Sequence, residues 1–146
     1  MKIGITSDHG GYKLKNKLIK SFRNKYDILD YGTDSEESVD YPDFAFKLGE
    51  AILRKDIDFG IAICKTGIGM SISLNKVKGI RCAKIDNLED AYYSKNHNNV
   101  NVIAISGKKS FIKAKGLVNT FIKTEVSKEK RHINRVNKIK EYENEH

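Results

Sequence analysis

The sequence predicts an α/β protein, with a three-layer α/β/α Rossmann-like fold around a five-stranded parallel sheet. Five short apolar runs alternate with longer segments in which apolar residues recur every three to four positions, the pattern of strands alternating with amphipathic helices. Strands separated by helices pair in parallel through right-handed crossovers, and the helices cover both faces of the sheet.

The first half of the chain is expected to alternate strand, helix, strand and helix. Leu14, Leu18 and Phe22 have the spacing of a buried helical stripe. Pro42, the only proline, closes a polar loop over Tyr31–Tyr41 and suits the first turn of a helix. The expected strands are Lys2–Ser7 and Asp27–Asp30, and the expected helices are Gly11–Lys25 and the segment that starts at Pro42.

The second half repeats this alternation and ends in a charged segment. Lys128–Tyr142 has few apolar residues, so we expect a helix that packs on a partner or lies on the surface. The chain is expected to form one domain over residues 1–146. The other expected strands are Phe59–Ile63, Ile80–Ile85 and Val100–Ile105, and the other helices are Ser71–Lys76, Leu88–Lys95 and Ser110–Thr124.

The formal net charge of +8 is concentrated toward the end of the chain. Residues 111–146 contain nine Lys and Arg against five Asp and Glu, which is half of the excess. Aromatic residues do not interleave with these charges, and no zinc-knuckle spacing or helix-turn-helix is present. Solvated helix faces and a local phosphate site are therefore favoured over nucleic-acid binding.

Other features bear on location. No apolar run approaches 18 residues, so no membrane partner is expected, and the first residues read as a strand instead of a signal peptide. Two cysteines, Cys64 and Cys82, fit a reducing environment better than a disulfide scaffold. We therefore expect a cytoplasmic protein.

The strongest functional signal is the stretch from Cys64 to Ser71, which joins a buried strand to a helix through glycines. Such a turn directs backbone N–H groups and the positive end of a helix dipole at one point, here with a thiol at its lip. Asp8-His9, Cys64–Gly69 and Ser106–Lys108 each follow a strand, so they are expected at the carboxyl edge of the sheet, where α/β proteins bind ligands. This arrangement indicates chemistry on a small anionic substrate.

Each candidate residue also has a structural interpretation. Asp8 could orient a hydroxyl or cap a helix, and His9 could bind a phosphate or be an exposed turn residue. Cys64 could be a base, favoured as thiolate by the facing amides, or a buried core residue. Arg131 and Arg135 lie four apart, which suits a phosphate clamp or a solvated helix face.

Metals and nucleotides are disfavoured. The four histidines show no i, i+4 pairing, and neither C-x-x-C nor H-E-x-x-H occurs. Neither G-x-G-x-x-G nor the P-loop pattern is present. We expect no metal and no organic cofactor.

Taken together, these motifs resemble the ribose-5-phosphate isomerase B family, which includes the subunits of galactose-6-phosphate isomerase. The matching features run in the family's order over nearly the whole chain and are specific only jointly. They are Ser7–Gly11, Asp40–Asp43, Cys64–Ser71, Asn75-Lys76, Gly79–Arg81, His97-Asn98 and Arg131-His132 with Arg135.

The resemblance implies interconversion of ribose 5-phosphate and ribulose 5-phosphate through an enediolate, as in the pentose phosphate pathway. Cys64 resembles the base that moves the proton between C1 and C2, and His97, helped by Asp8, resembles the acid that opens the furanose ring. The remaining implied roles are oxyanion contacts from Lys65, Thr66, Gly67, Ile68 and Gly69, phosphate contacts from His9, Lys108, Arg131 and Arg135, and sugar contacts from Tyr41 and Asn98.

Two residues depart from the family's pattern. Lys65 stands where glycine is usual, which would add strain if the backbone there needs a positive φ. Lys108 stands where arginine is common, and lysine offers a point charge instead of a bidentate fork.

The place of His97 predicts a shared site. It follows a helix and precedes the last strand, so it belongs at the amino edge of its own sheet, whereas Cys64 belongs at the carboxyl edge. A strand of five or six residues spans about 17–20 Å, too far for one imidazole to bridge. We therefore expect a homodimer with shared active sites, and a tetramer remains open.

Three alternatives stay open at this point. The substrate could be a six-carbon sugar phosphate, such as allose 6-phosphate or galactose 6-phosphate. The same cradle could serve a non-catalytic module that binds a nucleotide or RNA phosphate. Cys64 and Cys82 could form a thiol redox switch.

Overall fold

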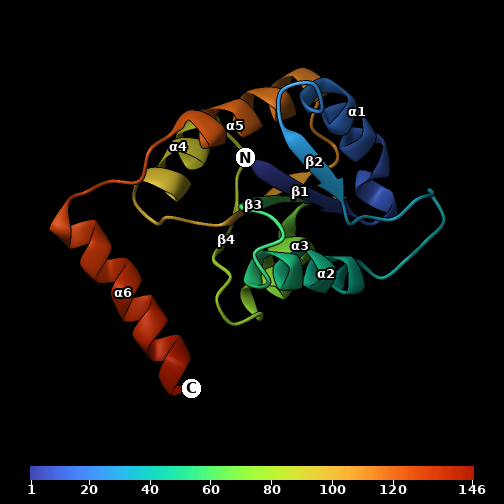
Figure 1. Cartoon of the computed structure of the whole chain (residues 1–146). Helices are drawn as coiled ribbons and strands as arrows, with labels where there is room; N and C mark the ends of the chain where they lie inside the picture. Colours follow the sequence, from blue (N-terminus) through green and yellow to red (C-terminus); the bar gives the residue numbers. More distant parts are fainter.

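A computed structural model describes residues 1–146 and contains one sheet of five parallel strands in the order β2-β1-β3-β5-β4 (Figure 1). The strands are β1 (Lys2–Ser7), β2 (Asp27–Asp30), β3 (Phe59–Cys64), β4 (Cys82–Lys84) and β5 (Val102–Ser106). The predicted fold class is therefore confirmed.

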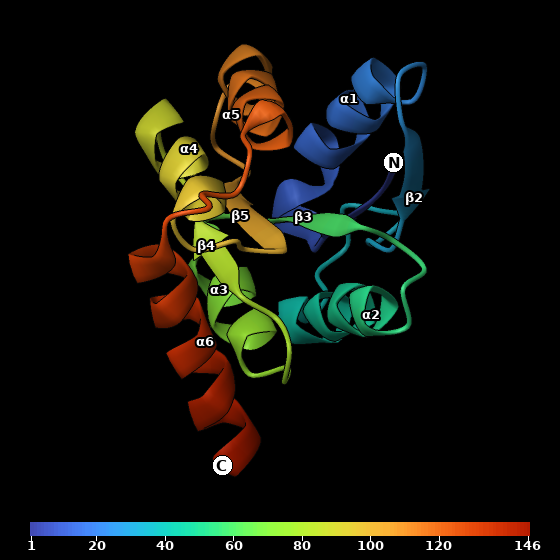
Figure 2. The ribbon, with the colours of Figure 1, turned by 60° about the vertical axis from the view of Figure 1, so that its left-hand side comes forward.

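Helices cover both faces of the sheet, with α1, α4 and α5 on one side and α2 and α3 on the other (Figure 2). Every residue of β3 is buried, as expected of a central strand covered on both sides. The helices are η1 (His9–Gly11, a 3-10 turn), α1 (Tyr12–Phe22), α2 (Tyr41–Leu53), α3 (Ile68–Asn75), α4 (Leu88–Asn96), α5 (Phe111–Lys123) and α6 (Lys130–Glu145).

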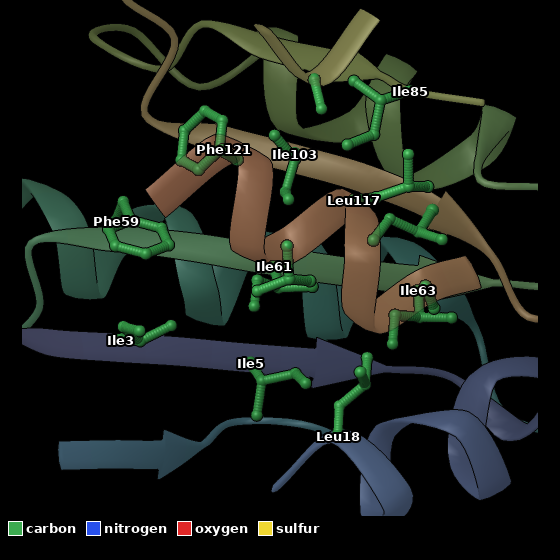
Figure 3. Close-up of a cluster of buried hydrophobic side chains, with 14 of the residues drawn as sticks. Ile3, Ile5, Leu18, Phe59, Ile61, Ile63, Ile85, Ile103, Leu117 and Phe121 are labelled. Carbon is green, nitrogen blue, oxygen red and sulfur yellow. The ribbon is translucent and has the colours of Figure 1, made fainter. Parts of the chain in front are cut away.

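The larger core lies between the sheet and α1, α4 and α5. Figure 3 shows isoleucines of β1 and β3 packed beneath Leu117 and Phe121 of α5. The Phe59 and Phe121 rings are tilted against each other, with centroids 5.2 Å apart. Burial of each large aliphatic or aromatic side chain contributes about 1.5–3 kcal/mol, so this layer fixes the sheet on which the site is built.

The strand order reverses between β1 and β3. From β1 the chain proceeds to β2 on one side, whereas β3 pairs with the other side of β1. Ser7 pairs with Ile63, and Cys64 pairs with Ser106, so the carboxyl ends of β1, β3 and β5 are level. Ligands of α/β sheets bind at such a switch point.

Some element boundaries differ from the expected ones. Helix α3 begins at Ile68 instead of Ser71, because Gly67 adopts a left-handed conformation with φ of 81° and closes the turn at once. Strand β4 is shorter than Ile80–Ile85, since Ile80 N–H donates to Val77 in a turn. Helix α1 ends at Phe22 instead of Lys25, because the amides of Lys25 and Tyr26 both turn back to the Phe22 carbonyl.

Helix α6 projects from the rest of the chain (Figures 1 and 2). Only His132 and Val136 among its residues are buried, and most of its charged side chains are exposed. Ile139 and Glu143 line a cavity of about 340 Å³ together with Cys82 of β4. None of the helices has both the length and the apolar character needed to cross a membrane.

Candidate active site

Asp8 and His9 follow β1 and begin the candidate site. Asp8 is 5% exposed, and its Oδ1 accepts from the N–H groups of Gly10 (2.9 Å) and Gly11 (3.3 Å). The capping interpretation of Asp8 is therefore confirmed, and its Oδ2 has no protein donor. His9 is exposed, and its Nδ1 accepts from Val39 N–H at 3.2 Å. An accepting Nδ1 assigns the ring proton to Nε2, which remains a free donor.

The turn after β3 directs backbone amides at the thiol. Gly67 N–H donates to Cys64 Sγ at 3.2 Å, which places the sulfur at the start of α3. Gly67 is required here, because its φ is 81° and a Cβ would lie 3.1 Å from the backbone carbon of Ile105. Thr66 Oγ1 accepts from Ile68 N–H at 3.2 Å and caps α3. The next amides, of Gly69 and Met70, have no acceptor in the preceding turn and are available to an anion.

The thiol is less open than the sequence suggests. Cys64 is only 4% exposed and lines none of the larger cavities of the chain. The sulfur lies at the expected turn, where it accepts from Gly67 N–H, but the low exposure of Cys64 also fits the alternative interpretation of a core residue. The low exposure of this residue limits the access of a substrate to Cys64.

Tyr41 and Lys65 flank this turn. The Tyr41 ring lies against the start of α3, so a Cβ on Gly69 would be 2.6 Å from it. Lys65 is exposed and is not among the residues with a positive φ, so lysine in place of glycine adds no backbone strain. The carbonyl of Lys65 accepts from Ser106 Oγ at 2.8 Å, which ties the turn to the end of β5.

Lys108 lies at the same edge, in the turn after β5. Its N–H donates to Ser106 Oγ at 3.2 Å, and Gly107 N–H donates to the Cys64 carbonyl at 2.8 Å. A Cβ on Gly107 would clash with the carbonyl of Gly10, so the three loops are in direct contact. Lys108 lines a cavity of about 430 Å³ together with Thr66 and Ile68.

His97 and Asn98 lie elsewhere, after α4 and before β5. The turn that carries them is held by Arg81, whose Nε donates to the Asn98 carbonyl at 3.2 Å and whose Nη2 donates to that of Asn99. Asn101 secures the same region by bonding the Arg81 N–H (2.9 Å) and the Gly79 carbonyl (2.9 Å). Burial lowers the pKa of Arg81 from its ordinary value, and the nearby Glu143 opposes that shift.

Helix α6 adds its residues to this second group. The His97 and His132 rings stack with centroids 3.9 Å apart, which places the first turns of α6 beside His97. Burial, and then the charges of His97 and Arg131, lower the pKa of His132. Arg131 and Arg135 are exposed, and Arg131 Nε donates to Glu129 at 2.8 Å.

The candidate residues thus form two groups at opposite ends of β5. Cys64 is level with Ser106 at one end, whereas His97 and Asn98 precede Val102 at the other. Four residues of strand span about 13 Å, so one chain does not bring His97 to Cys64. The first group contains Asp8, His9, Tyr41, Cys64, Lys65, Thr66, Gly67, Ile68, Gly69 and Lys108, and the second contains His97, Asn98, Arg131 and Arg135.

The two cysteines cannot form a disulfide in this fold. Cys64 pairs with Ser106 and Cys82 with Val102, four positions apart on β5, whereas disulfides need Cα atoms within about 7 Å. Burial raises the pKa of Cys82 to about 12, which keeps this thiol protonated. A redox switch that works through a disulfide between Cys64 and Cys82 of one chain is therefore excluded.

The structure contains no group of three or more His, Cys, Asp and Glu that could hold a metal ion.

Comparison with known proteins identifies the family. A family model described as Ribose/Galactose Isomerase matches residues 3–139. The chain belongs to the ribose/galactose isomerase family.

Members of this family with solved structures share the whole fold. The ribose-5-phosphate isomerase B of Clostridium thermocellum is 44% identical, with a TM-score of 0.95 over 99% of both chains. That of Mycoplasma genitalium, solved with bound ribulose-5-phosphate, is 34% identical, with a TM-score of 0.92 over 99% of this chain and 97% of its own.

The comparison of sequences agrees with the comparison of structures. The Escherichia coli ribose-5-phosphate isomerase B is 36% identical over 108 residues, which are 73% of this chain and 72% of that protein.

Several residues that lie beside the two groups of candidate residues were not identified from the sequence as functional residues. Lys84, Lys109 and Lys113 line a cavity together with Lys108. Lys109 directly follows Lys108 in the sequence, whereas Lys84 and Lys113 lie outside the recognised motifs. Arg81 and His132 stood within those motifs without a role. The contacts of Arg81 and His132 depend on tertiary packing. Only the proximity of His132 to Glu129 and Arg135, each three positions away on α6, is visible in the sequence.

Proposed function

We propose that this chain interconverts ribose 5-phosphate and ribulose 5-phosphate, with Cys64 as the base. One observation carries the proposal. The Cys64 sulfur accepts from Gly67 N–H at the start of α3, so this thiol and unpaired helix amides lie at one edge of the sheet. The family and its ribose-5-phosphate isomerase B members support the substrate.

The reaction needs a proton to leave C2 of the open-chain aldose and return to C1. As the base, Cys64 Sγ takes the C2 proton as the carbonyl at C1 becomes an enediolate oxygen. Sγ then returns this proton to C1, and the hydroxyl proton of O2 passes to O1, so that C2 becomes the ketone carbonyl. A positioned base contributes about 10²–10⁴-fold. The N–H groups of Gly69 and Met70 face the developing oxyanion, where one preorganised donor is worth about 2.7–4 kcal/mol.

The remaining residues of the first group bind and orient the sugar phosphate. The Nε2–H of His9 points away from its contact with Val39 and can donate to a phosphate oxygen. The free Oδ2 of Asp8 can accept from a sugar hydroxyl. Phosphate binding far from the reacting carbons supplies orientation, and it does not need to change during the proton transfer.

The second group completes the site of another subunit in this proposal. His97 would protonate the ring oxygen of the furanose, Asn98 would contact the sugar, and Arg131 with Arg135 would bind the phosphate. The separation of the two groups along β5 and the projecting α6 support a homodimer with two shared sites. The sugar-phosphate enzymes among its relatives and the two unpaired cysteines support a cytoplasmic location.

The direct test measures ribulose 5-phosphate formation from ribose 5-phosphate in excess chelator, with wild type, Cys64→Ser and the matched Cys82→Ser variant. We expect Cys64→Ser to lose nearly all activity and Cys82→Ser to retain it. Allose 6-phosphate and galactose 6-phosphate are assayed in parallel. Turnover of a six-carbon substrate alone, or full activity of Cys64→Ser, would contradict the proposal.

A further inference from the structure

A strongly basic cavity adjoins the candidate site on the side of β4. It has a volume of about 430 Å³ and opens at the carboxyl edge of the sheet. Lys84 from the end of β4, Lys109 from the turn after β5, and Lys113 from α5 line it beside Lys108. None of Lys84, Lys109 and Lys113 belongs to the proposed substrate site.

The charges around this cavity are poorly balanced. Four lysines face a single carboxylate, Asp86, which leaves a net charge of +3. Lys84 Nζ lies 2.8 Å from both oxygens of Asp86, and Lys109 Nζ is 4.0 Å from one of them. The hydrogen bond from Lys84 lowers the pKa of Asp86. Lys108 and Lys113 have no acidic partner, so the cavity concentrates a positive potential.

Two of these lysines are held in place by the surrounding structure. The side chains of Lys84 and Lys109 are only 28% and 21% exposed, compared with 81% for Lys13 on α1. A lysine that is largely enclosed loses less conformational freedom when it binds an anion than a fully solvated one. The ammonium groups are therefore partly preorganised around the cavity.

Helix α5 adds a second source of positive potential. Its first residue, Phe111, follows Ser110, which lines the same cavity and accepts from Lys113 N–H at 3.3 Å. The amides of Phe111 and Ile112 precede the first intrahelical hydrogen bond, so they remain available at a helix of 13 residues.

We propose that this cavity binds a small anion with two phosphate groups, such as a pyrophosphate or a bisphosphate. A single phosphate would leave part of the +3 charge uncompensated, whereas two phosphate groups match both the charge and the spread of the lysines over β4, the β5 turn and α5. Because Thr66 and Lys108 also belong to the proposed substrate site, the bound anion competes with the sugar phosphate. This competition rests on the proposed function, but the binding itself does not.

Isothermal titration calorimetry with inorganic pyrophosphate and orthophosphate, in metal-free buffer of constant ionic strength, tests the site. We expect pyrophosphate to bind at least about tenfold more tightly than orthophosphate, and Lys84→Gln/Lys113→Gln to weaken it at least about tenfold. Lys115→Gln/Lys123→Gln, which changes two lysines of α5 outside the cavity, is the matched control. Equal affinity for both anions, or equal loss in both double variants, would overturn the proposal.

Kinetics separate this inference from the proposed function. Pyrophosphate is expected to inhibit ribose 5-phosphate turnover competitively, and Lys84→Gln/Lys113→Gln is expected to raise its inhibition constant with little change in the substrate KM. Binding by calorimetry in a protein without isomerase activity would refute the proposed function alone. Isomerase activity without pyrophosphate binding would refute this site alone.

Discussion

The imidazole rings of His97 and His132 stack at an interplanar angle of 14°, with centroids 3.9 Å apart. The Tyr93 ring is tilted against the His97 ring, with centroids 4.6 Å apart. His97 ends α4 and His132 belongs to the first turns of α6, so this contact attaches the projecting helix to the rest of the chain. Two stacked imidazole rings repel each other when both are protonated to the positively charged form.

This stacking predicts a pH-dependent stability. Burial first, and then the charge of His97, lower the pKa of His132 below 6.5 in the folded chain. The unfolded chain therefore binds more protons on this residue, so the stabilisation is complete above pH 6.5 and is lost as the pH falls through the folded-state pKa. We expect His132→Gln to flatten the fall in the free energy of unfolding below about pH 6.5.

Urea denaturation at fixed protein concentration, repeated at half-unit pH steps, measures this effect. His146→Gln is the control, because His146 is an exposed histidine at the end of the same helix. If both variants keep the wild-type slope, His132 does not contribute to the pH dependence.

The separation of Cys64 from His97 predicts complementation between inactive variants. Cys64→Ala and His97→Ala are each expected to be inactive alone. After equal mixing and subunit exchange, half of the dimers contain one intact shared site, so activity recovers to about a quarter of wild type. Steady-state assays before and after exchange measure this recovery.

A second mixture distinguishes active sites shared between two subunits from active sites within one chain. Equal mixing of wild type with the double variant Cys64→Ala/His97→Ala is expected to leave about a quarter of wild-type activity if sites are shared, and about half if each chain has its own site. Retention of half, with subunit exchange demonstrated by mass-tagged chains, would contradict the shared site.

The hydrogen bonds from Arg81 to the Asn98 and Asn99 carbonyls predict that a variant of Arg81 loses activity to a different extent with the two substrates. Arg81→Lys removes the planar fork, so the turn that carries His97 shifts. A misplacement of about 1 Å costs on the order of 10²-fold in rate. Ribulose 5-phosphate has no furanose form, because its O5 carries the phosphate, so we expect its turnover to fall much less than that of ribose 5-phosphate. Arg54→Lys, at an exposed ion pair, is the control. An equal loss with both substrates would rule out this role of Arg81.

The sheet and its site edge were predictable because apolar runs and the residues that follow them are local patterns. Ser7–Gly11 and the turn after Phe59–Ile63 could be placed at one edge once the strands were taken as parallel. The sequence left Cys64 open between a base and a buried core residue, because burial is set by contacts between distant segments. The left-handed conformation of Gly67 was not predictable, since this residue lies against Ile105 of a distant strand. The same turn moved the start of α3.

Side-chain contacts between residues far apart in the sequence could not be predicted either. The stripe of Leu14, Leu18 and Phe22 correctly predicted the buried face of α1, but Lys15 lies among those buried residues although it is charged. Its partners are Asp30 and Thr33, in β2 and the loop after it. Sequence periodicity assigns a lysine to the solvent face and gives no sign of such a pair.

The buried position of Lys15 predicts that its replacement lowers the stability of the protein and also weakens substrate binding. It is 1% exposed, and its Nζ donates to Asp30 Oδ2 at 2.7 Å and to the Thr33 carbonyl at 3.0 Å. Removal of one partner from a buried pair costs about 3–5 kcal/mol, and the half-exposed Asp30 reduces this to about 1–3 kcal/mol for Lys15→Met. The loop after β2 leads to Val39, which contacts His9, so we also expect a higher KM for ribose 5-phosphate.

Chemical denaturation and steady-state kinetics of Lys15→Met, compared with Lys13→Met, test both parts. The Lys13 side chain is 81% exposed and lies 3.4 Å from Glu36, a surface pair worth about 0–1 kcal/mol, so its loss should change little. A lower stability with an unchanged KM would show that the loop after β2 holds His9 without this lysine. An unchanged stability would show that hydrogen bonds from water to Asp30 and to the Thr33 carbonyl replace those from Lys15 without loss.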